Sequence, residues 1–139
     1  MDPVSQGLLG TAFSASFAKK KEIRFASFCG LIGGLAPDID ILIRSQSNPL
    51  LFIEYHRHFT HSLLFAPFGG LIVSILLNFI FLKKKNFKTI YIFTTLGFFS
   101  HGFLDSCTSY GTSLLWPFSE TRVSWNIISI IDPIYTFIL

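Results

Sequence analysis

The chain has 139 residues, of which 50% are hydrophobic, 17% are aromatic and only 14% are charged, with a formal net charge of +3. A typical soluble domain carries about 25% charged residues, so this chain has too few to build the polar shell that a water-facing surface needs. The composition therefore excludes an ordinary soluble domain and predicts a protein in contact with lipid. At this length we expect one integral membrane domain over residues 1–139.

Five apolar segments follow one another along the chain. The first, residues 3–18, is rich in small residues, which suit close helix packing in a bilayer. The second runs from residue 25 to about residue 43 and is interrupted by Pro37-Asp38-Ile39-Asp40. The third, residues 62–82, contains no charge and is long enough to cross about 30 Å of hydrocarbon.

The last two segments cover residues 89 to about 105 and residue 123 to the end of the chain. We expect each segment to form a helix, so the sequence predicts an all-α fold, a polytopic transmembrane bundle of about four to five short helices. The final segment is still apolar at its end, which fits either a truncated chain or a helix that ends at the membrane surface. No basic region precedes the first segment, so we expect no cleaved signal peptide.

Two clusters of basic residues, at 19–24 and 83–88, set the expected orientation. Each cluster lies directly between apolar segments, which is typical of a cytoplasmic loop rather than of a nucleic-acid surface. With both clusters in the cytoplasm, all four His and all five Asp residues fall on the opposite side of the membrane. Because no His or Asp entered this assignment, their convergence predicts a functional site on that side.

Ionisable residues at membrane depth are costly and are typical of functional sites. His101 and Asp105 are four residues apart and share one face of a helix, where they could bind one metal ion. The alternative is a His–Asp hydrogen bond that only stabilises the helix. Asp38 and Asp40, on an extended turn, could point the same way and hold a hard cation, although a solvated turn explains such a pair taken alone.

Three histidines precede the third segment, in His56-Arg57-His58-Phe59-Thr60-His61. We expect Thr60 to cap the helix and His61 to lie in its first turn, where the helix N-terminus favours neutral imidazole. His56 could close over the same site. The alternative is that the histidines only anchor the chain at the membrane surface. Arg57 could pair with a substrate phosphate or with a lipid headgroup.

Histidines together with aspartates suit zinc or another first-row divalent ion. A bound ion lowers the pKa of its water, and a spare carboxylate can act as general base or orient a histidine. Ser62 and Ser100 adjoin histidines, so Ser–His–Asp catalysis is open by residue type, but no motif supports it. Cys29 and Cys107 form no CxxC pattern and are expected to be free thiols.

In combination, these motifs resemble the YdjM-type family of inner-membrane proteins, described as membrane-bound metal-dependent hydrolases. The matching residues are Met1-Asp2-Pro3-Val4-Ser5-Gln6, Gly10, Pro37-Asp38-Ile39-Asp40, His56-Arg57, Phe59-Thr60-His61-Ser62, His101, Asp105, Thr108-Ser109-Tyr110-Gly111-Thr112, Trp116-Pro117-Phe118 and Ile131-Asp132-Pro133. The resemblance implies a bacterial inner-membrane location. It also implies six metal-binding residues: His56, His61, His101, Asp105, Asp38 and Asp40. His58 stands where the family pattern is variable and is not assigned.

We therefore expect a membrane-bound hydrolase with a divalent metal ion, zinc being the leading candidate. Its substrate is expected to be a phosphoester or lipid-linked molecule, because a site at the membrane edge meets headgroups first. Asp38 and Asp40 are the candidate general bases and Arg57 the candidate anion clamp. The alternatives are a metal transporter or sensor and a non-catalytic scaffold. A transporter needs polar groups through the bilayer, and the third segment offers only Ser74 and Asn78 past its middle.

The charge pattern predicts a labelling result. With Cys29 and Cys107 replaced, a single cysteine near Ser47 or Ser113 should react with a membrane-impermeant thiol reagent in intact cells, whereas one near Asn86 should be shielded. The reverse pattern would contradict the orientation and the outward-facing site.

Overall fold

A computed structural model describes residues 1–43, 56–80 and 85–139. Within these ranges the protein contains helices and two isolated β-bridges, but no strand. The elements, with η marking a 3-10 helix, are α1 (Pro3–Ser16), η1 (Lys20–Glu22), α2 (Ile23–Leu35), η2 (Ala36–Leu42), η3 (Phe59–His61), α4 (Ala66–Ile80), α5 (Phe87–Ser106) and α6 (Pro133–Ile138). The all-α prediction is confirmed for this part of the chain.

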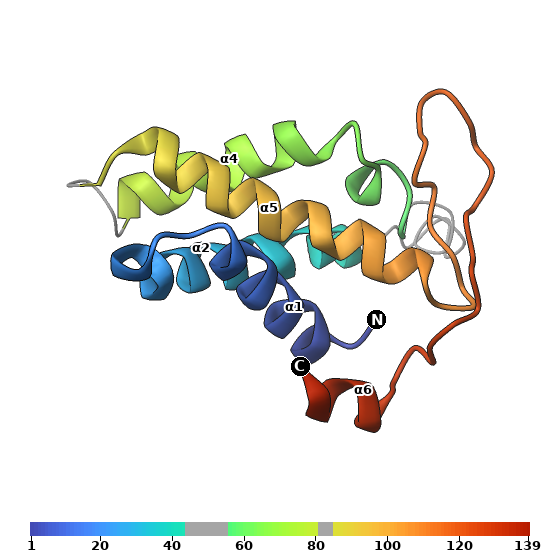
Figure 1. The fold of residues 1–139 in the computed structure, drawn as a ribbon. Helices are drawn as coiled ribbons and strands as arrows, with labels where there is room; N and C mark the ends of the chain where they lie inside the picture. The colour runs from blue at the N-terminus through green and yellow to red at the C-terminus, as the bar shows by residue number, and fades with distance from the viewer. Residues whose placement is uncertain (44–55, 81–84) are drawn as a thin grey trace.

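Helix α5 is the centre of the bundle, because it contacts α1, α2 and α4, and α1 also packs on α2 (Figure 1). Glycines allow the backbones to approach closely at these crossings. A Cβ atom added at Gly30 would lie 2.2 Å from the Gly10 carbonyl oxygen, and one at Gly97 would lie 2.3 Å from the Gly30 carbonyl oxygen. Three helices therefore meet backbone to backbone around Gly30, as the small residues of the first segment suggested for a bilayer protein.

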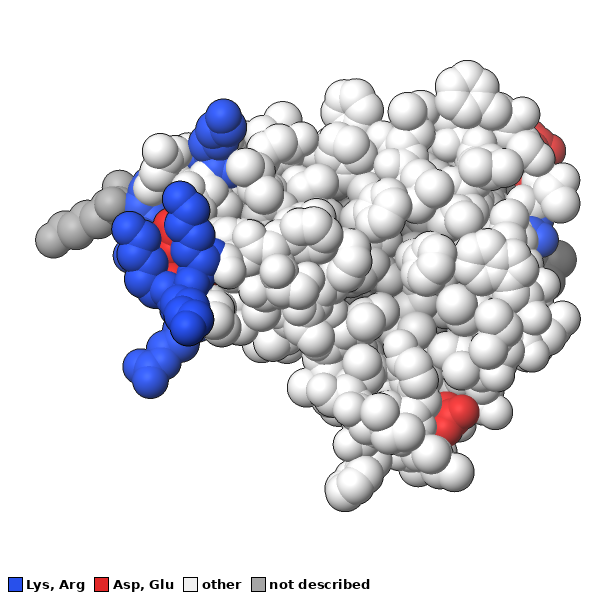
Figure 2. Space-filling view, in the orientation of Figure 1, with Lys and Arg blue, Asp and Glu red and all other residues white. Residues whose placement is uncertain are grey.

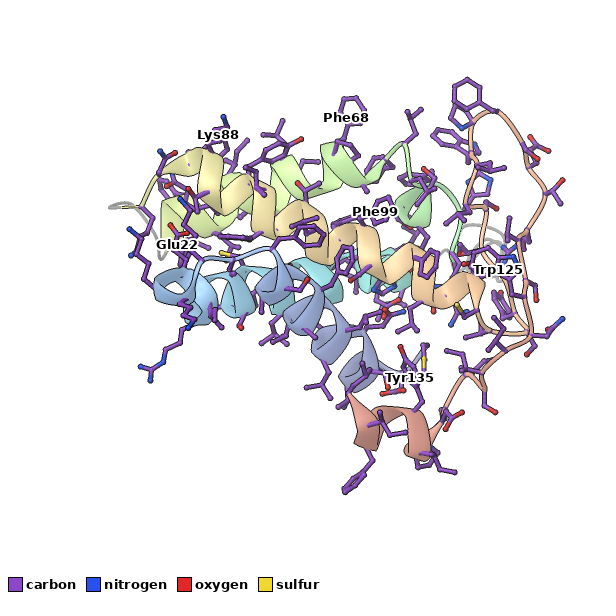
Figure 3. The ribbon with its side chains drawn as sticks, viewed as in Figure 1. Glu22, Phe68, Lys88, Phe99, Trp125 and Tyr135 are labelled. Atoms are coloured by element: carbon purple, nitrogen blue, oxygen red, sulfur yellow. The ribbon has the colours of Figure 1, made fainter. Side chains whose placement is uncertain are left out.

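Lys and Arg side chains gather at one end of the bundle, and a wide band of uncharged surface adjoins them (Figure 2). Glu22 and Lys88 lie at this basic end, whereas Trp125 lies near the other (Figure 3). Between the ends, α4 presents apolar side chains outward, and Phe68, which points away from the bundle, is 61% exposed. A large exposed apolar surface of this kind fits contact with lipid.

One helical stretch among the described residues, Lys20–Leu42, is long and apolar enough to cross a membrane. It joins η1, α2 and η2. Helix α4 is also apolar, but it has only 15 residues, and positions 81–82 of the third predicted segment lie outside the described part of the chain. The polytopic arrangement therefore stays a prediction.

The fifth predicted helix is wrong over most of its length. Only Pro133–Ile138 is helical, and residues 107–132, here called the strap, cross the end of α5 without forming a helix (Figure 1). The Trp125 N–H donates to the Ser106 carbonyl at 2.8 Å. The last carbonyls of a helix have no partner within it, and the strap satisfies this one. A long-range backbone contact thus outweighs the apolar pattern of the segment.

The start of α4 also differs from the prediction. Thr60 lies in η3, and its hydroxyl donates to Asp40 Oδ2 at 2.9 Å instead of capping a helix. The capping contact comes from Ser62, whose hydroxyl accepts from the Phe65 N–H. His61 is therefore in a 3-10 turn and not in the first turn of α4. The reason is that a buried carboxylate needs donors, and Thr60 serves Asp40.

The structure changes the best reporter for the labelling experiment. Ser113 is 1% exposed and its N–H donates to the Arg57 carbonyl, so a cysteine there would be inaccessible from either side. Glu120, in the same strap, is exposed and is the better position. Ser47 lies outside the described residues.

The helix crossing at Gly30 predicts a stability difference between two glycine substitutions. Gly30→Ala should lower the free energy of unfolding by about 1–3 kcal/mol, because the new methyl group meets backbone and helices must move apart. Gly7→Ala meets only the end of the Leu31 side chain at 2.8 Å, and alanine favours helix, so stability should change little. Thermal unfolding of both variants in detergent tests this. Equal midpoints would contradict close packing at Gly30.

Candidate metal centre

Four side chains from three elements meet at the end of the bundle away from the lysines. Asp38 comes from η2, His61 from η3, and His101 and Asp105 from the last turns of α5. One potential ligand atom of each lies within 4.8 Å of the other three. The spacing of four residues places His101 and Asp105 on one helix face, as the sequence predicts.

The distances between these ligand atoms are those of a small coordination site. His61 Nε2 and His101 Nε2 lie 2.9 Å apart. His61 Nε2 is 3.2 Å from Asp105 Oδ2 and 3.6 Å from Asp38 Oδ1. From His101 Nε2 the same two oxygens are at 3.5 Å and 3.3 Å. Tetrahedral ligands with bonds of about 2.0–2.1 Å are separated by about 3.3 Å, so these edges fit one zinc-sized ion.

The second nitrogen of each imidazole is held by an acceptor. His101 Nδ1 lies 2.5 Å from the Gly34 carbonyl oxygen, which can only accept, so Nδ1 carries the proton. His61 Nδ1 lies 2.9 Å from the Thr60 hydroxyl and 3.3 Å from Asp40 Oδ2. Both rings therefore direct Nε2 to the centre of the site. Such support fixes the tautomer and the ring orientation that a metal ligand needs.

The two carboxylate oxygens of Asp105 have different surroundings. Its Oδ1 accepts from Gln6 Nε2 at 3.0 Å and contacts the nitrogen of Met1. Its Oδ2 is buried and has no hydrogen bond, although Arg57 Nε lies within ion-pair distance at 3.2 Å. A buried carboxylate oxygen without a hydrogen bond is costly, and this one faces both Nε2 atoms. A cation at the centre would satisfy it, so the residues fit a divalent metal ion.

The charge of the site also fits a cation. Burial alone would lower the pKa of the His61 imidazole, but the surrounding carboxylates of Asp105, Asp38 and Asp40 outweigh this effect and raise the pKa to about 10. The carboxylates therefore favour a positive charge at this position. A metal ion bound there would supply that charge.

Two of the six predicted metal residues, His56 and Asp40, lie outside the group of four. His56 Nδ1 is 2.8 Å from Asp40 Oδ1, and Asp40 Oδ2 accepts from the Arg57 N–H at 3.0 Å. Asp38 and Asp40 do not point the same way, since residues two apart in a 3-10 helix lie on different faces. Asp38 belongs to the group of four, called the metal group from here on (Asp38, His61, His101 and Asp105). Asp40 lies behind this group and contacts the His61 and His56 rings. His58 packs against Trp116 at 5.8 Å between ring centroids.

Arg57 is 5% exposed, so it has little access to lipid headgroups. Besides Asp105, its guanidinium contacts the Thr108 hydroxyl, to which Nη1 donates at 3.0 Å. Its backbone adopts a φ of 61°, a strained value for a non-glycine residue. This conformation accompanies the donation of its N–H to Asp40 and places both ends of the residue in the site.

Sequence reasoning missed the roles of Gln6, Gly34 and Thr108. Gln6 is fully buried in the first apolar segment, and its Oε1 has no partner. A polar amide in an apolar helix was the signal that could have identified it. Nothing local distinguishes the carbonyl of Gly34 or the hydroxyl of Thr108, because their contacts come from distant parts of the chain.

A separate apolar cavity of about 450 Å³ lies between α1, α5 and the strap. Phe99, Phe103 and Cys107 line it. At helical spacing these residues fall on the face of α5 opposite His101 and Asp105. The cavity is therefore not the pocket of the metal site.

Comparison with known proteins agrees with the resemblance. The chain is similar to the uncharacterized protein YfhP of Bacillus subtilis (strain 168), with 34% identity over 103 residues, which cover 74% of this chain and 31% of YfhP. It is also similar to the inner membrane protein YbcI of Escherichia coli (strain K12), with 32% identity over 111 residues, which cover 74% of this chain and 61% of YbcI. The chain thus spans less than two thirds of either relative.

No solved structure matches the chain. The family model described as "YdjM inner membrane protein" matches residues 1–139. On this full-length match, the chain belongs to the YdjM family of inner membrane proteins.

Proposed function

We propose that this protein is a membrane-bound hydrolase that uses one divalent metal ion, with zinc as the leading candidate. The observation that carries the proposal is the set of five distances, 2.9–3.6 Å, that join the His61 and His101 nitrogens to each other and to the carboxylates of Asp38 and Asp105. Two imidazoles and two carboxylates are a ligand set that zinc accepts. The two carboxylates would also neutralise the ion, which reduces the cost of burying its charge.

When bound, the ion would polarise a substrate oxygen and lower the pKa of water. The protein's own residues would supply orientation and proton handling. Asp38 is the member of the group open to solvent, with 23% of its side chain exposed. We assign it as the general base: His61, His101 and Asp105 would then hold the ion and leave a position for the water that Asp38 deprotonates. Asp40 is a positioning residue, because it holds His61 and His56. Arg57 remains the candidate clamp for a negatively charged substrate.

The expected substrate is a phosphoester or lipid-linked molecule at the extracytoplasmic side of the bacterial inner membrane. Two features support this location. The basic end of the bundle (Figure 2) is suited to the cytoplasm. Lys88 lies at the start of α5, whereas His101 and Asp105 lie in its last turns, away from this end. A site at the membrane edge would then meet lipid headgroups on the outer side. The bilayer would both surround the protein and supply its substrate.

Metal transport by the same residues is less well supported. A path for a cation needs polar groups that can replace water along the bundle. Deeper in the bundle, the buried hydroxyl of Ser14 donates to the Phe93 carbonyl and that of Ser74 to the Gly70 carbonyl. Helix α4 contains no carboxylate or imidazole, and those of α5, His101 and Asp105, lie in its last turns.

Metal analysis of purified protein tests the first step of the proposal. We expect about one zinc ion per chain, as a group of four ligands supports. His61→Ala combined with His101→Ala should remove the metal, because two of the four ligands are lost. His58→Ala is the matched control and should retain it, since His58 packs against Trp116. Full metal retention in the double variant would rule out the assigned ligands.

Hydrolysis itself is tested with zinc-loaded protein in bilayer discs and a panel of phosphodiesters and lipid substrates. Asp40→Asn should retain zinc but lower turnover by roughly ten- to a hundredfold, because the support of His61 is weakened. Asp132→Asn, which alters only the cap of α6, should leave turnover unchanged. A chelator should abolish the activity. Metal-dependent ion uptake without hydrolysis, lost in Asp40→Asn, would instead establish a transporter.

A further inference from the structure

We infer that Arg122, which packs against Tyr110 in front of the buried Arg57, forms an anion-binding subsite beside the metal group, and that this subsite takes a phosphate group. The inference rests on the proposed function, which it deepens by naming the recognised group. Arg122 was not among the candidate residues, because it lies in the strap, distant in sequence from His56 and Arg57. Its position follows from the strap's path over the end of the bundle (Figure 1).

Among the described residues of the site, exposure differs between side chains. Those of His61, His101 and Asp105 are 0% exposed. The side chain of Asp38 is 23% exposed and that of His56 is 19% exposed. In this part of the chain, the accessible side of the site, here called the opening, is therefore the one at Asp38 and His56.

Arg122 lies at this opening. Its Nη2 donates to the His56 carbonyl at 3.2 Å, and its guanidinium carbon is 5.1 Å from the centre of the Tyr110 ring. The guanidinium carbon of Arg57 is 5.0 Å from the same ring. The Tyr110 ring thus contacts both the Arg122 guanidinium at the opening and the Arg57 guanidinium, which reaches Asp105 inside the site.

The strap holds Arg122 in this place through the adjacent residue. Thr112 and Val123 form a β-bridge in which each N–H donates to the other's carbonyl, at 3.0 Å and 2.8 Å. Thr112 follows Gly111, whose φ of 72° turns the chain. The bridge brings residue 122 back beside His56, which is distant in sequence. Backbone pairing therefore orders an arginine that would otherwise be on a free loop.

The formal charges favour an anionic ligand. Among the described side chains of the site, Asp38, Asp40 and Asp105 are negative, and the guanidiniums of Arg57 and Arg122 together with a divalent ion would offset them. Guanidinium groups bind phosphate oxygens through two parallel hydrogen bonds. A cation and arginines placed around one phosphoryl group also stabilise the charge that develops during its transfer. A phosphate group satisfies these features better than a neutral ester or amide.

The test measures binding of inorganic phosphate to zinc-loaded protein in discs of phosphatidylcholine, by calorimetry. Arg122→Gln should raise the Kd for phosphate roughly tenfold or more, because a charged donor pair is lost. Arg122→Lys keeps the positive charge but loses the planar guanidinium, so its Kd for phosphate should lie between those of the unchanged protein and Arg122→Gln. Arg24→Gln, at the basic end, is the matched control and should bind phosphate as the unchanged protein does.

Zinc content is measured on the same samples, which separates the two proposals. If the unchanged protein holds no zinc, the proposed function itself fails. If zinc is retained throughout but Arg122→Gln binds phosphate normally, or if no sample binds phosphate, the subsite is overturned.

Two competitors identify the source of the phosphate group. Displacement of inorganic phosphate by phosphatidate placed in the disc, but not by soluble glycerol phosphate, would indicate a lipid headgroup. Displacement by glycerol phosphate alone would indicate a soluble phosphomonoester. Either result supports the subsite, and displacement by neither contradicts it.

Discussion

The buried carboxylate of Asp105 organises the end of this molecule. An ionised carboxylate away from water costs several kcal/mol unless charged and hydrogen-bonding partners surround it. Here the partners come from separate parts of the chain: Gln6 on α1, Arg57 before η3, His61 within η3, and His101 one turn earlier on α5. Because all four side chains contact the Asp105 carboxylate, these elements meet at one point.

Close helix packing makes this convergence possible. A Cβ atom at Gly102 would lie 2.2 Å from the His61 carbonyl oxygen, so η3 can approach α5 only over a glycine. At Gly34 a Cβ atom would lie 2.6 Å from the Gln6 carbonyl oxygen, and the same residue's own carbonyl accepts from His101. The geometry of the metal group therefore depends on how closely α1, α2 and α5 pack. A change at either glycine would alter the metal group through the backbone.

The arrangement also suits a membrane protein whose chemistry lies at the bilayer edge. The apolar surface has side chains such as Phe68 that point outward, while on the face shown in Figure 2 Lys and Arg gather at one end and few charged side chains appear elsewhere (Figures 2 and 3). The strap closes over the end of α5 and carries Tyr110 and Arg122 to the opening at His56. Apolar helices thus provide rigidity, and the irregular segment between α5 and α6 adds the groups that select a ligand.

The sequence by itself determined the features that depend on neighbours along the chain. Apolar length predicted α1, α2 and α5, and a spacing of four residues placed His101 and Asp105 on one face, because helix periodicity is local. Tertiary structure decided the rest. It separated Asp38 from Asp40 in a 3-10 turn and gave Thr60 to Asp40 instead of to a helix end. It also placed the apolar residues after 123 in a strap, where the Trp125 N–H donates to the Ser106 carbonyl at the end of α5, a pairing between distant segments that no local pattern reveals.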